Sequence, residues 1–405
     1  MKVPLAPSGL RSQDIEAVIQ TLHSGQLTMG KTVSQFESEM ANYLGVKHFV
    51  MMNSGSSANL AIFEALLRPS KGSALLKRGD SVLVPAIAWP TTIWPLIQFG
   101  LEPVFVDVDP STLAMNLELA RETCAKAKGS IKGIFPIHPL GLGIDHAKLS
   151  DLVEDYGLLL VNDVCESLGS WQGEVHSGTI GLASSFSFYF SHHITTMEGG
   201  GVATNNKEIY EDLKSIRSHG WSRDRNDYEL WNAQGPSSMN KFTFVTTGFN
   251  IRPMEIQAAI GLQQLNDIES FIQKRRKNVE AIEKALEGSN LKVLGKKGQT
   301  SIIEDKSHSW MHASIQTTTD NVSIRNKYVT FLETHGIETR PPLTGNFLRQ
   351  PAMERLFPKQ INPADFPASD YATQSTFLVG CHHDLTVNQL DYLIEKIRQM
   401  VSMDY

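Results

Sequence analysis

The stretch HFVMMNSGSSANLAIFEALL, residues 48–67, predicts a strand, a turn and a helix in that order. Its apolar start is typical of a short buried strand, and apolar residues then recur at helical spacing. Between them, the turn SGSS would place backbone N–H groups at the positive end of a helix dipole, where phosphate groups bind. Such turns are more often plain helix caps, so both interpretations stay open for this motif alone.

The same alternation of strand and helix patterns continues along the chain. Further strand-like runs occupy residues 81–85, 102–108, 133–137, 158–163, 184–190 and 201–205. Helical patterns, such as that of residues 146–157, separate several of them. Continuous apolar strands that alternate with helices favour a mainly parallel sheet covered on both faces. The sequence therefore predicts an α/β fold.

The character of the chain changes near residues 265–275, where a long charged helical pattern begins. After it, short strand and helix patterns are mixed. We therefore expect a large α/β domain over residues 12–265 and a smaller C-terminal α+β domain over residues 266–405. Residues 1–11 could pack with either domain.

Composition argues against several classes of function. The 405 residues carry a formal net charge of −6 and no run of lysine or arginine, so neither nucleic acid nor an acidic membrane is an expected partner. No apolar run approaches the roughly 18–20 residues of a membrane span, and the N-terminus lacks the apolar core of a signal peptide. Three scattered cysteines disfavour a disulfide framework, a zinc ribbon or a four-cysteine iron–sulfur cluster. We expect a cytoplasmic protein.

Two carboxylates lie at or just after the end of the predicted strand at residues 158–163. Ligands bind at the carboxyl ends of strands in open α/β sheets, and Asp163 there could hold a proton on a heterocyclic nitrogen. An aspartate that caps the next turn is an equally good interpretation of Asp163 alone. Glu166 follows three residues later and is placed to face the same pocket.

Two adjacent histidines, His192 and His193, stand in SFYFSHHITTMEGG, residues 187–200. Paired histidines suggest a metal, but no carboxylate or cysteine at ligand spacing accompanies them, and we expect no metal site. A solvent-exposed histidine is the ordinary alternative. The glycines that follow argue against it, because close approach of the backbone suggests a buried pocket.

Together these motifs resemble the DegT/DnrJ/EryC1/StrS family of sugar aminotransferases, which are fold-type-I pyridoxal-phosphate enzymes. The resemblance extends over essentially the whole chain, through SGQLTMGKTVSQFESEMANYLG, NSGSSANLAIFEAL, VLVPAIAWPTT, VNDVCESLGS, SFSFYFSHHITTMEGGGVAT, RSHGW and GFNIRPMEIQAAIGLQQL in that order. It implies a large domain with a mainly parallel mixed sheet, a smaller C-terminal domain, and a homodimer with shared active sites.

Position 192 departs from the pattern of this family. The family usually has a lysine five residues after its phosphate-binding serine, which here is Ser187, and that position holds His192. The lysine binds the cofactor covalently and moves protons. A histidine cannot form that stable bond, but it can move protons near neutral pH. With a histidine at this position, the sequence resembles a narrower branch of the family, the GDP-4-keto-6-deoxy-D-mannose 3-dehydratases of colitose biosynthesis. Enzymes of this branch hold pyridoxamine 5′-phosphate (PMP) noncovalently.

The resemblance implies a role for each residue of the cofactor site. The implied set is Gly55, Ser56, Ser57, Trp89, Asp163, Glu166, Ser187 and Asn250. In this set the glycine and the serines hold the phosphate, and Asn250 reaches it from the other subunit. Trp89 stacks on the cofactor ring, although core packing is its alternative. Asp163 pairs with the protonated pyridine nitrogen, and Glu166 approaches the ring hydroxyl.

The implied reaction removes the C3 hydroxyl of a nucleotide-linked 4-keto-6-deoxyhexose, releases ammonia and regenerates PMP from L-glutamate. His192 is the expected catalytic base. His219 is either a helper or a structural residue, and His193 is expected to point away. The product would be a 3,6-dideoxysugar for the O-antigen of lipopolysaccharide.

Two other functions stay open. One is a nucleotide-sugar 4-aminotransferase that uses His192 as its base and glutamate as amino donor. The other is a non-catalytic binding protein with the same fold. The iron–sulfur CDP-sugar 3-dehydratases are disfavoured by the scattered cysteines. The sequence does not give the nucleotide, the configuration of the sugar, or the roles of Arg252 and Arg340.

Overall fold

The computed structural model describes residues 1–405 except 8, 232–241, 297–299, 319–321, 358–359 and 404–405. Its described strands are β1 (His48–Met52), β2 (Ser81–Pro85), β3 (Glu102–Val106), β4 (Ile131–Ile134), β5 (Leu159–Asp163), β6 (Trp171–Gln172), β7 (Val175–His176), β8 (Ala183–Ser187), β9 (Gly200–Thr204), β10 (Leu291–Val293), β11 (Ala313–Thr317), β12 (Thr339–Arg340) and β13 (Thr376–Val379). The predicted strands of the first 205 residues all appear in this set, with ends that differ by a few residues. Strand β4 stops before Pro136 because proline has no N–H for the ladder.

The main sheet has seven strands in the order β1–β9–β8–β5–β4–β2–β3. The five strands from β8 to β3 run parallel, and β9 runs antiparallel to both of its neighbours. This confirms the mainly parallel α/β sheet that the sequence predicts. The carboxyl ends of β1, β5 and β8 consequently meet at one edge of the sheet.

Helices cover both faces of the main sheet. The described helices are α1 (Ser12–Ser24), α2 (Lys31–Leu44), α3 (Gly55–Leu67), α4 (Pro90–Phe99), α5 (Leu117–Ala127), α6 (His146–Tyr156), α7 (Lys207–Ile216), α8 (Tyr228–Trp231), α9 (Glu255–Asn266), α10 (Ile268–Leu286), α11 (Val322–Thr334), α12 (Pro351–Leu356), α13 (Pro367–Ser375) and α14 (Val387–Val401). Successive residues of β1 point to opposite faces of the sheet, as strand geometry requires, and so they contact the two different helix layers. Val50 packs into the cluster of α3, α4 and α7, whereas Phe49 packs into the cluster of α2, α9 and α10.

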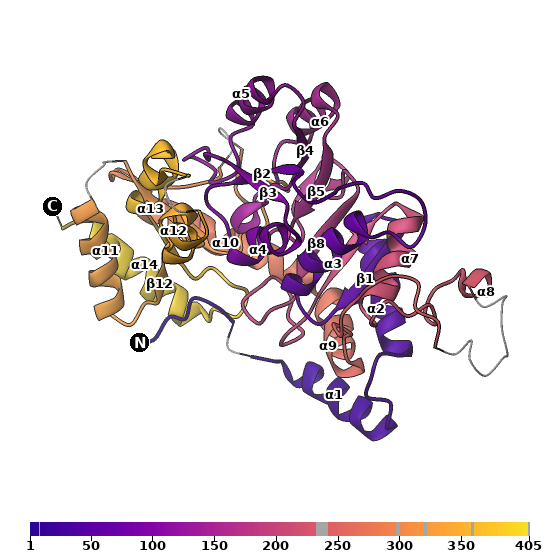
Figure 1. The fold of residues 1–405 in the computed structure, drawn as a ribbon. Helices are drawn as coiled ribbons and strands as arrows, with labels where there is room; N and C mark the ends of the chain where they lie inside the picture. The colour runs from indigo at the N-terminus through magenta and orange to yellow at the C-terminus, as the bar shows by residue number, and fades with distance from the viewer. Residues whose placement is uncertain (8, 232–241, 297–299, 319–321, 358–359, 404–405) are drawn as a thin grey trace.

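A second, antiparallel sheet has the order β10–β11–β13–β12 and lies with α11 and α14 at one end of the molecule (Figure 1). The N-terminal segment runs alongside it, since Val3 forms a parallel bridge with Ile337. The predicted division of the chain at residues 265–266 falls at the end of α9 and stays a prediction. None of the described helices combines the length and the apolar character needed to cross a membrane.

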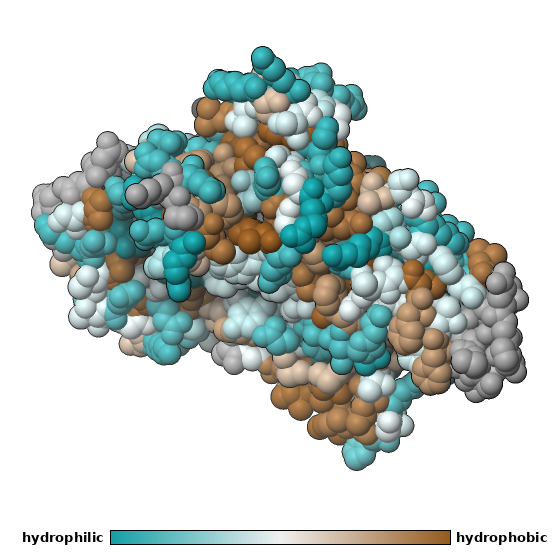
Figure 2. Space-filling model, viewed as in Figure 1, coloured by the Kyte–Doolittle hydropathy of each residue, from teal (hydrophilic) through white to brown (hydrophobic). Residues whose placement is uncertain are grey.

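Helix α1 turns apolar side chains outward. Ile15, Ile19 and Leu22 are 48%, 41% and 52% exposed, and Leu27 just after the helix is 45% exposed. Figure 2 shows this region as a hydrophobic patch at the lower edge of the molecule, where Figure 1 places α1. An exposed apolar patch on a folded chain commonly marks a protein–protein interface.

Candidate active site

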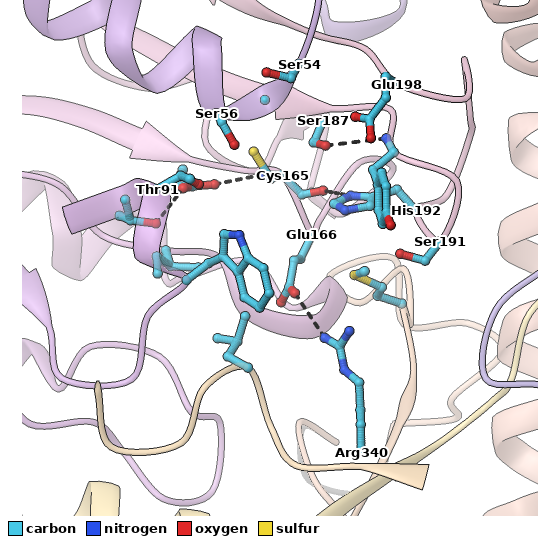
Figure 3. Close-up of a pocket in the computed structure, with 18 residues that line it drawn as sticks. Ser54, Ser56, Thr91, Cys165, Glu166, Ser187, Ser191, His192, Glu198 and Arg340 are labelled. Carbon is cyan, nitrogen blue, oxygen red and sulfur yellow. Dashed lines mark hydrogen bonds and ion pairs between the residues drawn. The ribbon is translucent and has the colours of Figure 1, made fainter. Parts of the chain in front are cut away.

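A cavity of about 280 Å³ opens at the carboxyl ends of β5 and β8, beside the start of α3. Figure 3 shows its walls, which come from parts of the chain that are far apart in sequence. The cavity brings together seven of the ten predicted site residues: Gly55, Ser56, Trp89, Asp163, Glu166, Ser187 and His192. Its position is the edge of an open α/β sheet where ligands bind.

The other three predicted site residues lie outside the walls of this cavity. Ser57 is engaged in the cap of α3, where its N–H and its hydroxyl each lie 3.0 Å from Ser54 Oγ. His219 and Asn250 are both exposed. They lie close to each other, because the N–H of His219 donates to Phe249 O at 2.8 Å and Asn250 forms a β-bridge with Ser218.

One end of the cavity is suited to a phosphate group. The N–H groups of Gly55 and Ser56 have no hydrogen-bond acceptor among the described residues, and Ser187 faces them from β8. A Cβ atom added to Gly55 would lie 2.6 Å from Ser187 Cβ, so only glycine lets the helix approach β8 this closely. Free N–H groups at a helix N-terminus together with a serine hydroxyl form an anion-binding arrangement.

Asp163 provides a buried negative charge, with only 5% of its surface exposed. Its Oδ2 accepts hydrogen bonds from Asn59 Nδ2 at 2.9 Å and Thr92 Oγ1 at 2.8 Å, and its Oδ1 accepts one from Cys165 N at 3.1 Å. No cationic side chain of the described chain forms an ion pair with it. A buried carboxylate held this way is favourable when a cation completes the site. The protonated ring nitrogen of a pyridine cofactor fits that need.

His192 lies half-buried in the loop after β8. Its Nδ1 is 2.5 Å from Cys165 O. Because a carbonyl oxygen only accepts, Nδ1 carries the proton and Nε2 of the neutral ring is left as a base. The backbone oxygen of His192 accepts a hydrogen bond from Arg275 at 3.2 Å. Burial lowers the pKa of His192 to about 4; the Cys165 hydrogen bond opposes this shift, whereas Arg340 and Arg275 add to it.

We predict that the acid limb of kcat/KM lies well below the ordinary pKa of histidine. Because burial lowers the pKa of His192 to about 4, its neutral, basic form predominates above that pH. A pH–rate profile is therefore expected to stay level down to about pH 5 and to fall only below it. A half-maximal kcat/KM near pH 6.5 would contradict this assignment.

A carboxylate and a guanidinium meet on the other side of the cavity. Glu166 is 8% exposed, and its Oε2 accepts a hydrogen bond from Leu140 N at 2.9 Å. Its Oε1 lies 3.6 Å from Arg340 Nη2 of β12. Figure 3 marks this ion pair with a dashed line. Burial raises the pKa of Glu166, and Arg340 counteracts part of this shift. No lysine is among the described residues that line the cavity, so no side-chain amine there can bind a cofactor covalently.

Several lining residues were not predicted from the sequence. They are Ser54, Thr91, Thr92, Ile137, Cys165, Tyr189, Ser191, Glu198, Met311, Arg340 and Leu343. The sequence assigns no role to Arg340. Cys165 lies between the two carboxylates, and burial raises the pKa of its thiol well above the usual range, which keeps it protonated. Thr92 stands within the quoted motif VLVPAIAWPTT, a signal that could have identified it, whereas no local pattern marks Arg340.

Comparisons with known proteins find similarity over nearly the whole chain. The chain matches the model of the DegT/DnrJ/EryC1/StrS aminotransferase family over residues 9–398. It is 35% identical over 398 residues to GDP-4-keto-6-deoxy-D-mannose 3-dehydratase of Escherichia coli O55:H7, which covers 98% of this chain and 99% of that protein.

Two solved structures of GDP-4-keto-6-deoxymannose-3-dehydratase are similar to the whole chain. One is a variant with bound GDP-perosamine; it has a TM-score of 0.88, is 34% identical, and covers 98% of this chain and 100% of its own. The other contains a trapped PLP-glutamate geminal diamine; it has a TM-score of 0.86 with the same identity and coverage.

Proposed function

Because this chain belongs to the DegT/DnrJ/EryC1/StrS aminotransferase family, we propose that it is a nucleotide-sugar 3-dehydratase dependent on pyridoxal or pyridoxamine phosphate. Its proposed substrate is GDP-4-keto-6-deoxy-D-mannose, and L-glutamate is the proposed amino donor. The observation that carries this proposal is His192, a neutral base in a cavity that has no lysine among its described lining residues. The proposed product is a 3,6-dideoxysugar of the colitose type for lipopolysaccharide O-antigen.

The residues at the two ends of the cavity support this proposal. In the proposal, Gly55, Ser56 and Ser187 hold the phosphate, and Asp163 keeps the ring nitrogen protonated. Trp89, 51% exposed at the start of α4, is placed to cover the ring. When bound, the cofactor supplies an amine for the C4 ketone of the sugar and an electron sink for loss of the C3 hydroxyl.

His192 moves the protons in this proposal. Its Nε2 would take a proton from C4′, the cofactor carbon that carries the amine. The hydrogen bond from Nδ1 to Cys165 O holds the ring in place. The resulting imidazolium then gives a proton to the departing C3 hydroxyl. General acid–base catalysis of this kind contributes about 10²–10⁴-fold to the rate. The lowered pKa of His192 keeps the ring unprotonated at rest and makes the imidazolium a stronger proton donor once it is charged.

Analysis of the products tests the proposed function. The purified protein is incubated with PMP, L-glutamate and GDP-4-keto-6-deoxy-D-mannose, and the products are identified by mass spectrometry and an ammonia assay. The expected result is a 3-deoxy-4-keto sugar with ammonia released. A 4-amino sugar that keeps its C3 hydroxyl would instead show the 4-aminotransferase. Failure to bind PMP would favour the non-catalytic binding protein.

We also propose a homodimer with shared active sites that works in the cytoplasm. The exposed apolar residues of α1 support an interface between two copies. Asn250 is exposed and lies outside its own cavity, as expected for a residue that completes the site of the other subunit. Free Cys124, Cys165 and Cys381 are compatible with a reducing compartment.

Shared sites predict complementation between two inactive variants. His192→Asn removes the base, and Asn250→Ala removes the contribution to the neighbouring site. A mixed dimer still has both native residues in one of its two sites, so mixed dimers purified through both tags should have about half of the native activity. The measurement uses co-expressed, differently tagged chains purified through both tags. Complete inactivity of the mixed dimer would show that Asn250 serves its own subunit.

A further inference from the structure

Arg275 of α10 is a fully buried cation, with none of its surface exposed. Among the described residues, no carboxylate forms an ion pair with it. Burial lowers the pKa of Arg275, and Cys381 and Asp384 counteract part of this shift. A guanidinium stays charged in proteins, and a buried charge without a counter-ion is costly. Charges that are kept at such a cost are concentrated at functional sites.

The guanidinium of Arg275 donates to three backbone carbonyl groups. Its Nη2 lies 3.2 Å from His192 O. Its Nη1 lies 2.8 Å from Met311 O and 3.3 Å from Trp310 O. His192 and Met311 both line the active-site cavity, whereas Arg275 does not. One side chain outside the cavity therefore ties two parts of its wall together.

The second of these wall segments is held in a strained conformation. Trp310 is buried and has a positive φ of 55°, which residues other than glycine rarely adopt. Its carbonyl accepts from Arg275 and also lies 3.4 Å from Cys381 Sγ. Next to it, Met311 N donates to Leu140 O at 2.9 Å. A strained backbone persists only where its surroundings hold it, and Arg275 supplies two of the hydrogen bonds that do so.

His192 is consequently held through both its ring and its backbone. Figure 3 marks the hydrogen bond of its ring to Cys165 O, and Arg275 binds its backbone carbonyl. We propose that Arg275 is a positioning residue for the reaction: its guanidinium fixes the loop of His192 against the wall at Met311 and places a positive charge near the base. This inference rests on the proposed function, and it gives a role to a residue that does not line the cavity.

The charge of Arg275 has an effect on His192 that packing alone would not have. Burial lowers the pKa of His192, the hydrogen bond to Cys165 opposes the shift, and Arg340 and Arg275 add to it. Arg340 lies 3.6 Å from Glu166, so Arg275 is the cation near His192 that no described carboxylate pairs with. The other ionisable groups on the cavity side are Tyr189 and Glu198.

On its own side of the site, Arg275 is surrounded by buried histidines. These residues are His193, His312, His382 and His383. Burial lowers the pKa of each of them, and Arg275 adds to the shift. The four rings are therefore neutral near neutral pH, and Arg275 is the charged member of this cluster.

Two substitutions separate the charge of Arg275 from its hydrogen bonds. Arg275→Gln removes the charge, whereas Arg275→Lys keeps the charge but lacks the planar fork that reaches several carbonyls. The full-length enzyme is labelled with carbon-13 histidine and titrated by NMR with and without PMP. The signal of His192 is identified by its absence from His192→Asn. Arg275→Gln should move the titration of His192 to higher pH, and Arg275→Lys should leave it as in the native enzyme.

Steady-state kinetics with PMP, L-glutamate and the nucleotide sugar measure the loss of position. Both variants are expected to lower kcat by about 10²-fold, as a displaced catalytic group can, with little change in KM. The acid limb of kcat/KM should move to higher pH in Arg275→Gln only.

The matched control is Arg276→Gln. Arg276 is the next residue of α10, is 2% exposed and donates to His308 O at 3.2 Å, but it does not line the cavity. This variant should lower the melting temperature and leave both the titration of His192 and kcat unchanged.

The outcomes separate this inference from the proposed function. Native titration of His192 in Arg275→Gln overturns the inference even if the enzyme dehydrates nucleotide sugars, and so does an equal shift in Arg276→Gln. If Arg275→Gln does not fold, Arg275→Lys decides: a native kcat overturns the inference, and a lowered kcat with native titration supports it. A shifted titration in Arg275→Gln, when the native enzyme dehydrates no nucleotide sugar, overturns the proposed function alone.

Discussion

Replacing His192 with asparagine is expected to lower kcat for dehydration by about 10²–10⁴-fold, the usual contribution of an acid–base group. Asparagine can keep the hydrogen bond to Cys165 O that His192 makes through Nδ1. It has no basic nitrogen to replace Nε2. The variant should therefore bind PMP normally and fail at the proton transfer. Steady-state kinetics with product analysis measure the first effect, and PMP absorbance after gel filtration measures the second.

His335→Asn is the matched control for this substitution. The Nδ1 of His335 also lies within hydrogen-bond distance of a backbone carbonyl, Phe331 O at 2.8 Å, but His335 directly follows α11 and does not line the cavity. The control should keep native kcat. If His192→Asn also kept more than half of the native kcat, another group would be the base.

Asp163→Asn is expected to reduce kcat by about 10²-fold or more, as loss of a preorganised charge at a reacting group commonly does. The carboxylate is buried and accepts hydrogen bonds from Asn59 and Thr92. The neutral amide cannot hold the ring nitrogen in its protonated form, and it leaves the Asn59 amide facing a weaker acceptor. The measurements are kcat at saturating PMP and the absorption spectrum of the bound cofactor.

Asp107→Asn separates this effect from a loss of stability. Asp107 is also buried and accepts hydrogen bonds from Ala368 and Ser369, but it does not line the cavity. It should lower the melting temperature and leave kcat per bound cofactor unchanged. If Asp163→Asn changed only the melting temperature in the same way, its proposed role at the ring nitrogen would be wrong.

The main sheet could be predicted from the sequence because its buried strands leave short apolar runs. Strand β2 has the bounds that its run predicts, and β5 ends at Asp163 as predicted. Helix α1 shows the limit of such patterns. Its apolar spacing identifies a helical face, but spacing alone does not reveal that Ile15, Ile19 and Leu22 face away from their own chain.

The predicted end of the strand at residues 158–163 identifies Asp163, whereas Ser187 and His192 are identified through the resemblance to the family. Within SGSS, Ser56 and Ser57 are the serines predicted to hold the phosphate. The structure places Ser54 and Ser56 at the cavity, and it engages Ser57 with Ser54 in the cap of α3. Arg340 reaches the site only because β12 pairs with β13 in the second sheet. No local pattern in the sequence carries that information.

The mass of the intact enzyme after borohydride reduction in the presence of pyridoxal phosphate tests the central claim most directly. Borohydride fixes a cofactor that is bonded to a lysine, whereas a noncovalent cofactor is lost on denaturation. With His192 in place of the lysine, the native chain is predicted to keep its unmodified mass, and His192→Lys is predicted to gain the mass of one cofactor. A native chain that carries the cofactor on any lysine would contradict the account.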